Sequence, residues 1–357
     1  MAAYTTIDDP SAYFKVQLYT GNGSANHAIT FDDTDTDMQP DLVWIKNRDA
    51  TDSHCLFDSA RGVTKLVSPD STDMQSTDTD TLDSFASDGF QVDADVKVNT
   101  NTEDYVAWCW NTQGGAGSSN TTGSINTTTT SVGATQGISV STFSSTGSAA
   151  TLGHGLGAVP HFFFFRHLTT TGGETARDWP VYHKNNTAAP ETDYLILNSD
   201  AATADALLWN DTAPSSTLIS IGDGSEINQV NGTYAVFAFT EKQGFSKFGS
   251  YEGTGNADGA FVYTGFRPAF VLMKCIDSSG TDWNIWDNRR PGYNPNYYLP
   301  PNKNLAEVTA HELDLLSNGF KARANNNDQN KAANTYIYAA FAEAPFVNSN
   351  GVPCTAR

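Results

Sequence analysis

The chain has 357 residues, of which 39% are hydrophobic and 11% aromatic, and its 40 acidic and 20 basic side chains give a formal charge of −20. This composition excludes a disordered chain, no apolar run approaches the roughly 20 residues of a membrane span, and nucleic-acid binding would need a basic cluster that the sequence lacks. We therefore expect neither membrane insertion nor nucleic acid as a partner. The length predicts two or three modules, and the first residues carry no secretory signal.

Short apolar segments bounded by proline or turn residues predict buried strands in residues 1–113. The segment 104–110 alternates large and small side chains, as a strand does when one face packs a core. Trp44 is expected in that core, and Lys46 is expected at the surface, either as a strand end whose amine reaches water or as a partner for nearby acidic loops. The landmark segments are LYTGNG (18–23), QPDLVWIK (39–46), SHCLFD (53–58), LDSFASDGFQV (82–92) and DYVAWCW (104–110).

Acidic runs separate these segments. The first run contains three alternating aspartates, Asp33, Asp35 and Asp37. Alternation of this kind opens a calcium loop, but Met38 and Trp44 stand where such a loop needs Gly and Glu. We therefore expect a solvated acidic loop here and in the run at 69–83, and we predict no metal site and no cofactor.

The landmarks return twice after a segment rich in Gly, Ser and Thr, 114–135, which predicts a linker. Their prolines, Pro40, Pro160 and Pro268, are separated by 120 and 108 residues. The second copy contains TFSSTG (142–147), VPHFFFFR (159–166), DWPVYH (178–183), LISIGDGSEI (218–227) and TYAVFAF (233–239). The third copy contains SYEGTG (250–255), RPAFVLMK (267–274), DWNIWD (282–287), LDLLSNGFKA (313–322) and TYIYAAF (335–341).

Many short strands between turn-forming clusters predict an all-β protein built from three tandem β-sandwich modules of the jelly-roll or concanavalin-like type. The predicted organisation is repeat 1 at 1–113, the linker at 114–135, repeat 2 at 136–242, repeat 3 at 243–347 and a C-terminal tail at 348–357.

The sequence carries no catalytic motif around its histidines or cysteines. His154 and His183 lack the patterns of hydrolases and metalloproteases, and the glycines around His154 predict a turn. The four cysteines, Cys55, Cys109, Cys275 and Cys354, lie far apart, so free buried thiols are expected, with a Cys55–Cys109 disulfide left open. Carboxylates that could form a glycosidase pair are too abundant to single one out; examples are Asp282, Asp287, Glu307 and Glu312. We therefore predict no catalytic residues and no enzyme, with depolymerase activity as a minority hypothesis.

The third copy offers aromatic side chains for recognition. The segment YNPNYYLPP (293–301) is a loop by its Pro and Asn content, and Tyr293, Tyr297 and Tyr298 form its predicted recognition surface. Packing against a neighbouring subunit is the alternative role for these rings. In DWNIWD the two tryptophans point to opposite faces of a strand, so one leaves the core unless both faces are covered.

The residues resemble a repeat family of structural proteins from tailed bacteriophages, especially phages of marine bacteria and cyanobacteria. The resemblance covers about residues 14–346. It is carried by LYTGNG, QPDLVWIKNRD, HCLFDSARG, SFASDGF and YVAWCW, and later by GHGLGAVP (153–160), FGSYEGTGNADGAFVYTGFRPAFVLMK (248–274) and YIYAAFAEAPF (336–346). It implies a virion component with a lectin-like fold and supplies no catalytic residues.

This resemblance leads us to expect a virion surface protein, made in the host cytoplasm without a signal peptide and placed on the tail or capsid. A tail fibre or tail-associated protein that attaches to host-surface glycans is the leading expectation, and a capsid decoration or cement protein is the alternative. Its expected partners are other virion proteins and host glycans. A homo-oligomer is also expected, with a trimer as the guess because phage fibres are usually trimeric.

Overall fold

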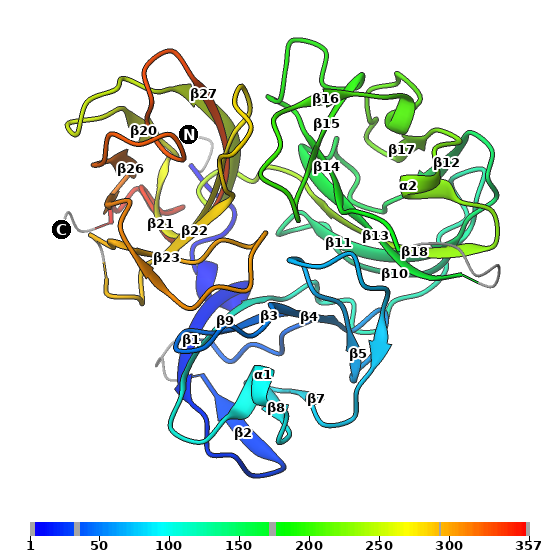
Figure 1. The fold of residues 1–357 in the computed structure, drawn as a ribbon, viewed down its shortest axis with the longest axis horizontal. Helices are drawn as coiled ribbons and strands as arrows, with labels where there is room; N and C mark the ends of the chain where they lie inside the picture. Colours follow the sequence, from blue (N-terminus) through cyan, green and yellow to red (C-terminus); the bar gives the residue numbers. More distant parts are fainter. Residues whose placement is uncertain (1–3, 32–35, 171–175, 293, 355–357) are drawn as a thin grey trace.

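A computed structural model describes residues 4–31, 36–170, 176–292 and 294–354 (Figure 1). It shows an all-β protein whose antiparallel strands gather in three sheet-rich regions around a common centre. We call these regions module 1 (β1 to β9), module 2 (β10 to β18) and module 3 (β19 to β27).

Each module contains a main sheet in which four strands follow the same order. The main sheets are β1-β9-β3-β4, β11-β18-β13-β14 and β19-β27-β21-β22. Their bounds are β1 (Phe14–Thr20), β3 (Leu42–Asn47), β4 (Cys55–Asp58), β9 (Asp104–Trp110), β11 (Ile138–Ser144), β13 (Phe162–Thr170), β14 (Pro180–His183), β18 (Gly232–Phe239), β19 (Ser246–Glu252), β21 (Phe266–Cys275), β22 (Asn284–Asp287) and β27 (Thr335–Pro345). The sequence landmarks therefore mark equivalent strands.

A smaller sheet covers the outer face of each main sheet. These sheets are β2 (His27–Thr30), β8 (Gly89–Val92) and β7 (Leu82–Ala86); β12 (Ala150–Gly153) and β17 (Leu218–Ile221); and β20 (Phe261–Tyr263), β26 (Gly319–Ala322) and β25 (Leu313–Leu316). Short pairs and single turns complete the fold: β5 (Lys65–Leu66) with β6 (Ser76–Thr77), β23 (Tyr297–Tyr298) with β24 (Val308–Thr309), η1 (Pro10–Ala12), α1 (Val96–Asn99), η2 (Leu207–Trp209) and α2 (Ser225–Asn228).

Module 2 has a wider main sheet than its neighbours. Strand β10 (Thr127–Gly133) pairs with β11 at one edge, and β15 (Asp193–Ile196) and β16 (Ala204–Asp205) extend the other edge. Since β10 lies inside the range 114–135, part of the predicted linker is a strand of module 2.

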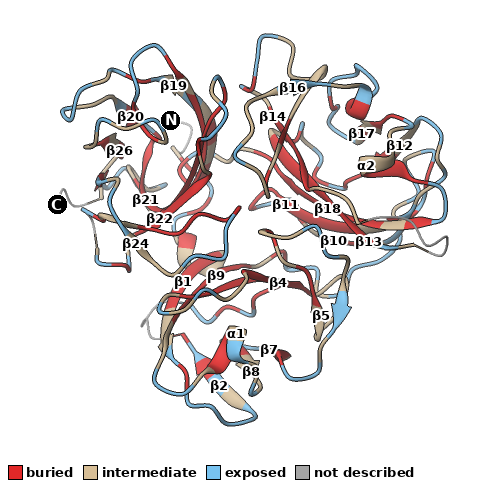
Figure 2. Ribbon diagram, in the orientation of Figure 1, coloured by how far each residue is buried: buried red, intermediate tan, exposed pale blue. Residues whose placement is uncertain are grey.

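The inner strands of the main sheets, such as β3, β9 and β21, are buried almost throughout, so both of their faces are covered (Figure 2). In β9, Trp108 points into an apolar cluster shared by all three modules, whereas Cys109 points into the separate core of module 1. Strand β22 behaves in the same way, with Ile285 in the shared core and Trp286 in the core of module 3, and Trp283, the residue before β22, also lies in the shared core. Because consecutive side chains alternate between faces, a strand with two covered faces reads as continuously apolar. This arrangement accommodates both tryptophans of DWNIWD.

Aromatic rings from the three modules meet in the shared core. Phe14 of module 1 stacks on Phe341 of module 3 with ring centroids 5.4 Å apart. Phe162 of module 2 stacks on Phe248 of module 3 at 5.8 Å. Pairs of this kind add about 0.5–1.5 kcal/mol to the effect of burying their area. The shared core therefore joins the modules into one body.

A ring of hydrogen bonds also links the modules. In each module, the residue just before β4, β14 or β22 donates its ring N–H to a backbone carbonyl of a neighbouring module. These residues are His54, Trp179 and Trp283, and they donate from module 1 to module 3, from module 2 to module 1 and from module 3 to module 2. The three bonds join His54 Nε2 to Pro300 (3.2 Å), Trp179 Nε1 to Ser71 (2.9 Å) and Trp283 Nε1 to Ile196 (2.9 Å). His54 accepts a bond at Nδ1 from Trp44, which fixes Nε2 as the protonated nitrogen.

The three copies also share one tyrosine contact. A tyrosine stands near the start of β9, β18 and β27. Its hydroxyl donates to the backbone carbonyl of the residue nine positions earlier and accepts the backbone N–H of the residue five positions earlier. The donated bonds join Tyr105 to Val96 (2.7 Å), Tyr234 to Ser225 (2.8 Å) and Tyr336 to Asn327 (2.8 Å). Each hydroxyl thereby closes the turn that precedes its own strand.

The expected surface position of Lys46 is wrong. Lys46 and its equivalents Arg166 and Lys274 have 0% exposure. The Lys46 amine donates to the carbonyls of Asn47 (2.6 Å) and Ala50 (3.0 Å), and burial lowers its pKa to about 8. The side chain does not reach water because the strand end is covered, and backbone carbonyls accept the hydrogen bonds that water would otherwise accept. Trp44 lies in the shared core, as the apolar segment predicts.

Candidate binding site

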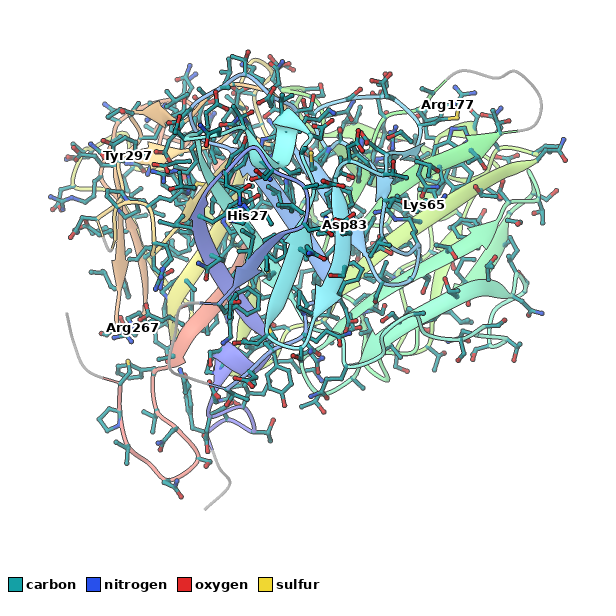
Figure 3. All side chains as sticks on the ribbon, turned by 90° about the horizontal axis from the view of Figure 1, so that it is seen from below. His27, Lys65, Asp83, Arg177, Arg267 and Tyr297 are labelled. Carbon is teal, nitrogen blue, oxygen red and sulfur yellow. The ribbon has the colours of Figure 1, made fainter. Side chains whose placement is uncertain are left out.

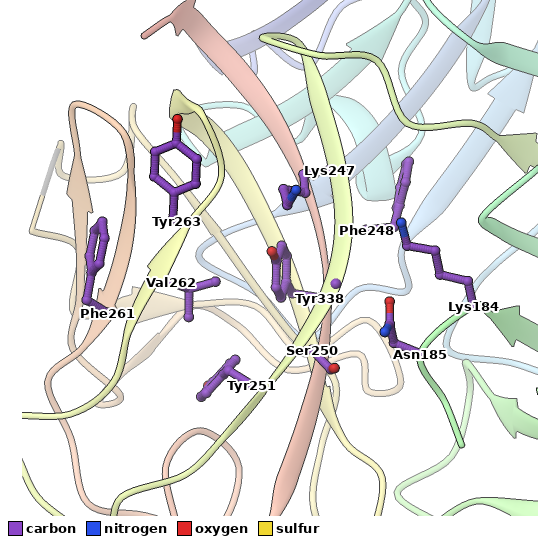
Figure 4. A pocket seen from close by; sticks show the side chains of 11 residues that line it. Lys184, Asn185, Lys247, Phe248, Ser250, Tyr251, Phe261, Val262, Tyr263 and Tyr338 are labelled. Atoms are coloured by element: carbon purple, nitrogen blue, oxygen red, sulfur yellow. The ribbon is translucent and has the colours of Figure 1, made fainter. Parts of the chain in front are cut away.

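An open groove lies where modules 2 and 3 meet (Figure 4). It measures about 500 Å³ and is lined by the edge strand β19, by residues of β20 and by the turn after β14. A second cavity of about 440 Å³ shares Asn185 and Ser250 with it. Together the two cavities flank most of β19.

Two lysines and one carboxylate define the charge at this groove. Glu241 accepts from Lys184 at 2.6 Å and from Lys247 at 3.3 Å, and both lysines line the groove. Burial raises the pKa of Glu241, but the hydrogen bond from Lys184 and the charges of both lysines outweigh it, so the pKa is lowered. The groove therefore carries a net positive charge in an acidic protein, since one carboxylate faces two ammonium groups.

Aromatic side chains line the other wall. Phe261 and Tyr263 are 48% and 50% exposed, whereas Val262 between them is buried, because β20 alternates its side chains between solvent and core. Beneath β19, the hydroxyl of Tyr338 lies so close to Gly249 that a Cβ at that position would meet it at 2.6 Å. The groove thus offers apolar rings, ammonium groups and a strand edge to a ligand.

Of the three predicted recognition tyrosines, the two that the structure describes do not form an exposed patch with each other. Tyr293 lies outside the described residues. Tyr298 is 9% exposed and stacks on His311 with ring centroids 4.3 Å apart, so it belongs to the core of module 3. Tyr297 is half-buried and lies at the periphery in Figure 3. Of the two described tyrosines, Tyr297 is the one with substantial exposure.

The groove was not found from the sequence. Its signal was present in FVY (261–263), where two large aromatic residues flank a small apolar one in a strand-like pattern. That pattern alone does not show which face of the strand is exposed, nor that residues of module 2 form the opposite wall of a groove.

The chain was compared with known proteins. It matches the family described as "Domain of unknown function (DUF7483)" over residues 9–345. The chain belongs to this family. A search of curated proteins found no match. The match of this DUF7483 member spans all three modules, so the family unit is the joined body rather than one repeat.

The histidines singled out in this DUF7483 chain make structural contacts. His154 Nε2 donates to the carbonyl of Ser215 (3.2 Å) and accepts the N–H of Leu156 at Nδ1, and burial lowers its pKa. His183 Nε2 donates to the carbonyl of Tyr338 across the module junction (3.1 Å), and burial lowers its pKa to about 3. Both side chains are buried and hold turns or neighbouring strands in place.

Two of the candidate glycosidase carboxylates belong to one ion-pair network. Arg290 donates to Asp287 at 2.6 Å and to Glu307 at 2.6 Å, and Arg48 donates to Glu307 at 2.9 Å. Burial raises the pKa of Glu307, but the hydrogen bond from Arg48 and the charge of Arg290 outweigh it and lower the pKa. These contacts join module 1 to module 3. A third candidate, Asp282, pairs with Lys303 at 2.6 Å.

The first acidic run is described only in part, because the described residues resume at Thr36. Asp33 and Asp35 lie outside the described residues. In the part of the chain that the structure describes, no three His, Cys, Asp or Glu side chains form a group that could hold a metal ion. No helix within the described ranges is both long and apolar enough to cross a membrane.

The cysteines are free thiols in the structure, which answers the question of a disulfide in module 1. Cys55 on β4 and Cys109 on β9 lie on either side of β3 in the same sheet. Neighbouring strands are about 4.8 Å apart, so the two Cα atoms are separated by roughly 10 Å, and a disulfide needs less than about 7 Å. The pair therefore cannot bridge.

Proposed function

We propose that this protein is a structural component of a tailed-phage virion, displayed on the particle surface, and that it works by binding. In this proposal its modules are sandwiches of the jelly-roll or concanavalin-like type. It serves as a tail fibre or tail-associated protein, held by other virion proteins and offering its outer loops to host-surface glycans. The sequence resemblance to phage structural repeats supports this assignment.

The observation that carries the proposal is the joining of the three modules. Each main sheet places one face in a shared apolar core, and each module donates a ring N–H to a neighbouring module. The modules therefore present their outer sheets and loops from one rigid body. A rigid support suits attachment, because ordering a binding surface in advance lowers the entropy lost on binding. Display of many copies on one particle would make weak single-site affinities sufficient.

Tyr297 is the described member of the predicted recognition loop that retains exposure for stacking on a sugar ring. A homotrimer remains part of the proposal, with each subunit contributing three modules. Sedimentation analysis of the purified protein would measure the oligomeric state directly.

A capsid decoration or cement role is the second candidate. The groove along β19 favours it, because a strand edge flanked by a neighbouring module suits a contact with another protein. In that role the protein would stabilise the particle and leave host attachment unchanged.

The two roles are separated by virions that lack the protein. Loss of adsorption to host cells with normal resistance to heat supports the attachment role. Normal adsorption with rupture under heat or osmotic shock supports the cement role. A reconstruction of the intact particle locates the subunit on tail or capsid. Absence from purified particles overturns both roles, and release of sugar from host polysaccharide by the purified protein overturns the binding-only proposal.

A further inference from the structure

The three main sheets differ at one edge. In module 2, β10 covers edge strand β11: Thr129 pairs with Thr142, and Ser131 pairs with Val140. The equivalent edge strands are β1 and β19. Among the described residues, β9 is the strand that pairs with β1, and β27 is the strand that pairs with β19. Within the described ranges, the same sheet edge thus carries an additional strand in module 2 and none in modules 1 and 3.

The position of β10 identifies the equivalent position in module 3. β10 lies beside the turn that follows β4 of module 1, where Thr129 donates to the carbonyl of Ala60 at 3.3 Å. Alignment of SHCLFD with DWPVYH places Lys184 and Asn185 at the equivalent turn after β14. This second turn faces β19 across the groove. The groove is therefore the counterpart of the space that β10 fills.

The backbone of β19 is oriented for pairing. Ala342 donates its N–H to the carbonyl of Phe245, so alternate residues from Phe245 onward direct their backbone groups to β27. The intervening residues Phe248 and Ser250 direct their N–H and C=O groups into the groove. Within the described part of the chain, no hydrogen bond reaches these four backbone groups. Phe248 and Ser250 correspond in register to Val140 and Thr142 of β11.

In module 1, a side chain caps one carbonyl of the equivalent edge. The Gln17 side chain donates to the carbonyl of Leu18 at 2.7 Å, and Leu18 is the register equivalent of Ser250. Gly249 stands at the position of Gln17 and has no side chain with which to cap the edge. Proteins usually cover or blunt exposed strand edges, so an uncovered edge inside a groove indicates a place for a partner strand.

We infer that β19 accepts an extended strand from another protein, paired antiparallel as β10 pairs with β11. The chemistry of β10, TTTTSVG, defines the partner: about five to seven residues, rich in small hydroxyl side chains that pass over Gly249. Strand addition joins the partner through backbone hydrogen bonds, while Phe261 and Tyr263 pack against its outward side chains. This inference rests on the groove and does not depend on the proposed role in host attachment.

A peptide probe tests the inference on the full chain. The probe is a fluorescent peptide with the sequence of residues 126–134, which includes β10. We expect saturable binding and slower hydrogen exchange at the amides of Phe248 and Ser250. Ser250→Pro removes one outward N–H without removing a bond to β27, and should weaken binding about tenfold, whereas Ser250→Ala keeps the N–H and should bind as the wild type does.

A second variant covers the case in which Ser250→Pro fails to fold. Asn185 is exposed on the opposite wall, so Asn185→Trp fills the groove without altering β19 and should also weaken peptide binding. The inference is overturned if the peptide does not bind at millimolar concentration, or if binding leaves the two amides unprotected. If self-association or an oligosaccharide protects the same amides in place of the peptide, the inference is also overturned, because a different ligand then occupies the groove.

Discussion

The indole N–H of Trp108 in module 1 donates a 3.0 Å hydrogen bond to Asp287 of module 3, 179 positions later in the chain. Asp287 also accepts from Arg290, whose guanidinium lies 5.5 Å from the centroid of the Trp108 ring. All three side chains are buried. The bond between Trp108 and Asp287 therefore links a ring of the shared core to a buried ion pair, and it joins module 1 to module 3.

Replacing Trp108 by Phe should destabilise the protein more than the same change at Trp110. Both rings lie in the shared core, but the buried Nε1 of Trp110 has no hydrogen-bond partner among the residues that the structure describes, so only Trp108→Phe removes a bond. We expect a difference of about 1–3 kcal/mol in the free energy of unfolding, measured by chemical denaturation. Equal losses for the two variants would show that the bond to Asp287 contributes nothing.

The three modules should unfold in a single transition. Their main sheets share one apolar core, so separating any module exposes the inner faces of the others. Differential scanning calorimetry should show one peak for the full chain, whereas residues 1–113 alone, with Trp44 and Trp108 uncovered, should show no cooperative transition. Three resolved peaks would contradict this expectation.

Acid should weaken the junction between modules 2 and 3. Burial lowers the pKa of His183 to about 3 from 6.5. The folded state then binds fewer protons than the unfolded state between these values, so the stability present above pH 6.5 is lost as the pH falls toward 3. The loss is about 1.4 kcal/mol per pH unit for each such histidine.

His183→Gln isolates this contribution. Above pH 7 the difference in unfolding free energy between the variant and the wild type should be constant, and below pH 6.5 the wild type should lose stability faster. Urea denaturation at several pH values measures both regions. Parallel curves from pH 7 to pH 4 would exclude His183 as a source of acid sensitivity.

All four cysteines should remain reduced and should differ in accessibility. Cys55, Cys109 and Cys275 are buried, and Cys354 is partly exposed. Alkylation followed by mass spectrometry should modify Cys354 first in the native protein and all four thiols after denaturation. A mass two units lower that is restored by reduction would reveal a disulfide and contradict the separation of Cys55 and Cys109 across β3.

The local pattern of apolar residues determined the strands and their repetition. Alternation in the segments of β9, β18 and β27 predicted strands, because strand geometry depends on neighbouring residues. Three sets of landmarks in the same order predicted three related units. The equivalent tyrosines Tyr105, Tyr234 and Tyr336 follow the same rule, since each bonds to backbone within nine residues of its own position.

Contacts between the copies were decided by the tertiary structure alone. The sequence showed Lys46 ending an apolar strand but could not show that other segments cover that end. It placed β10 in a linker because the composition TTTTSVG carries no sign of the strand β11 with which it pairs. The groove at β19 likewise depends on Lys184 and Asn185, more than sixty positions earlier in the chain. Burial and pairing of this kind depend on residues distant in sequence, and no local pattern encodes which distant surface will cover a given face.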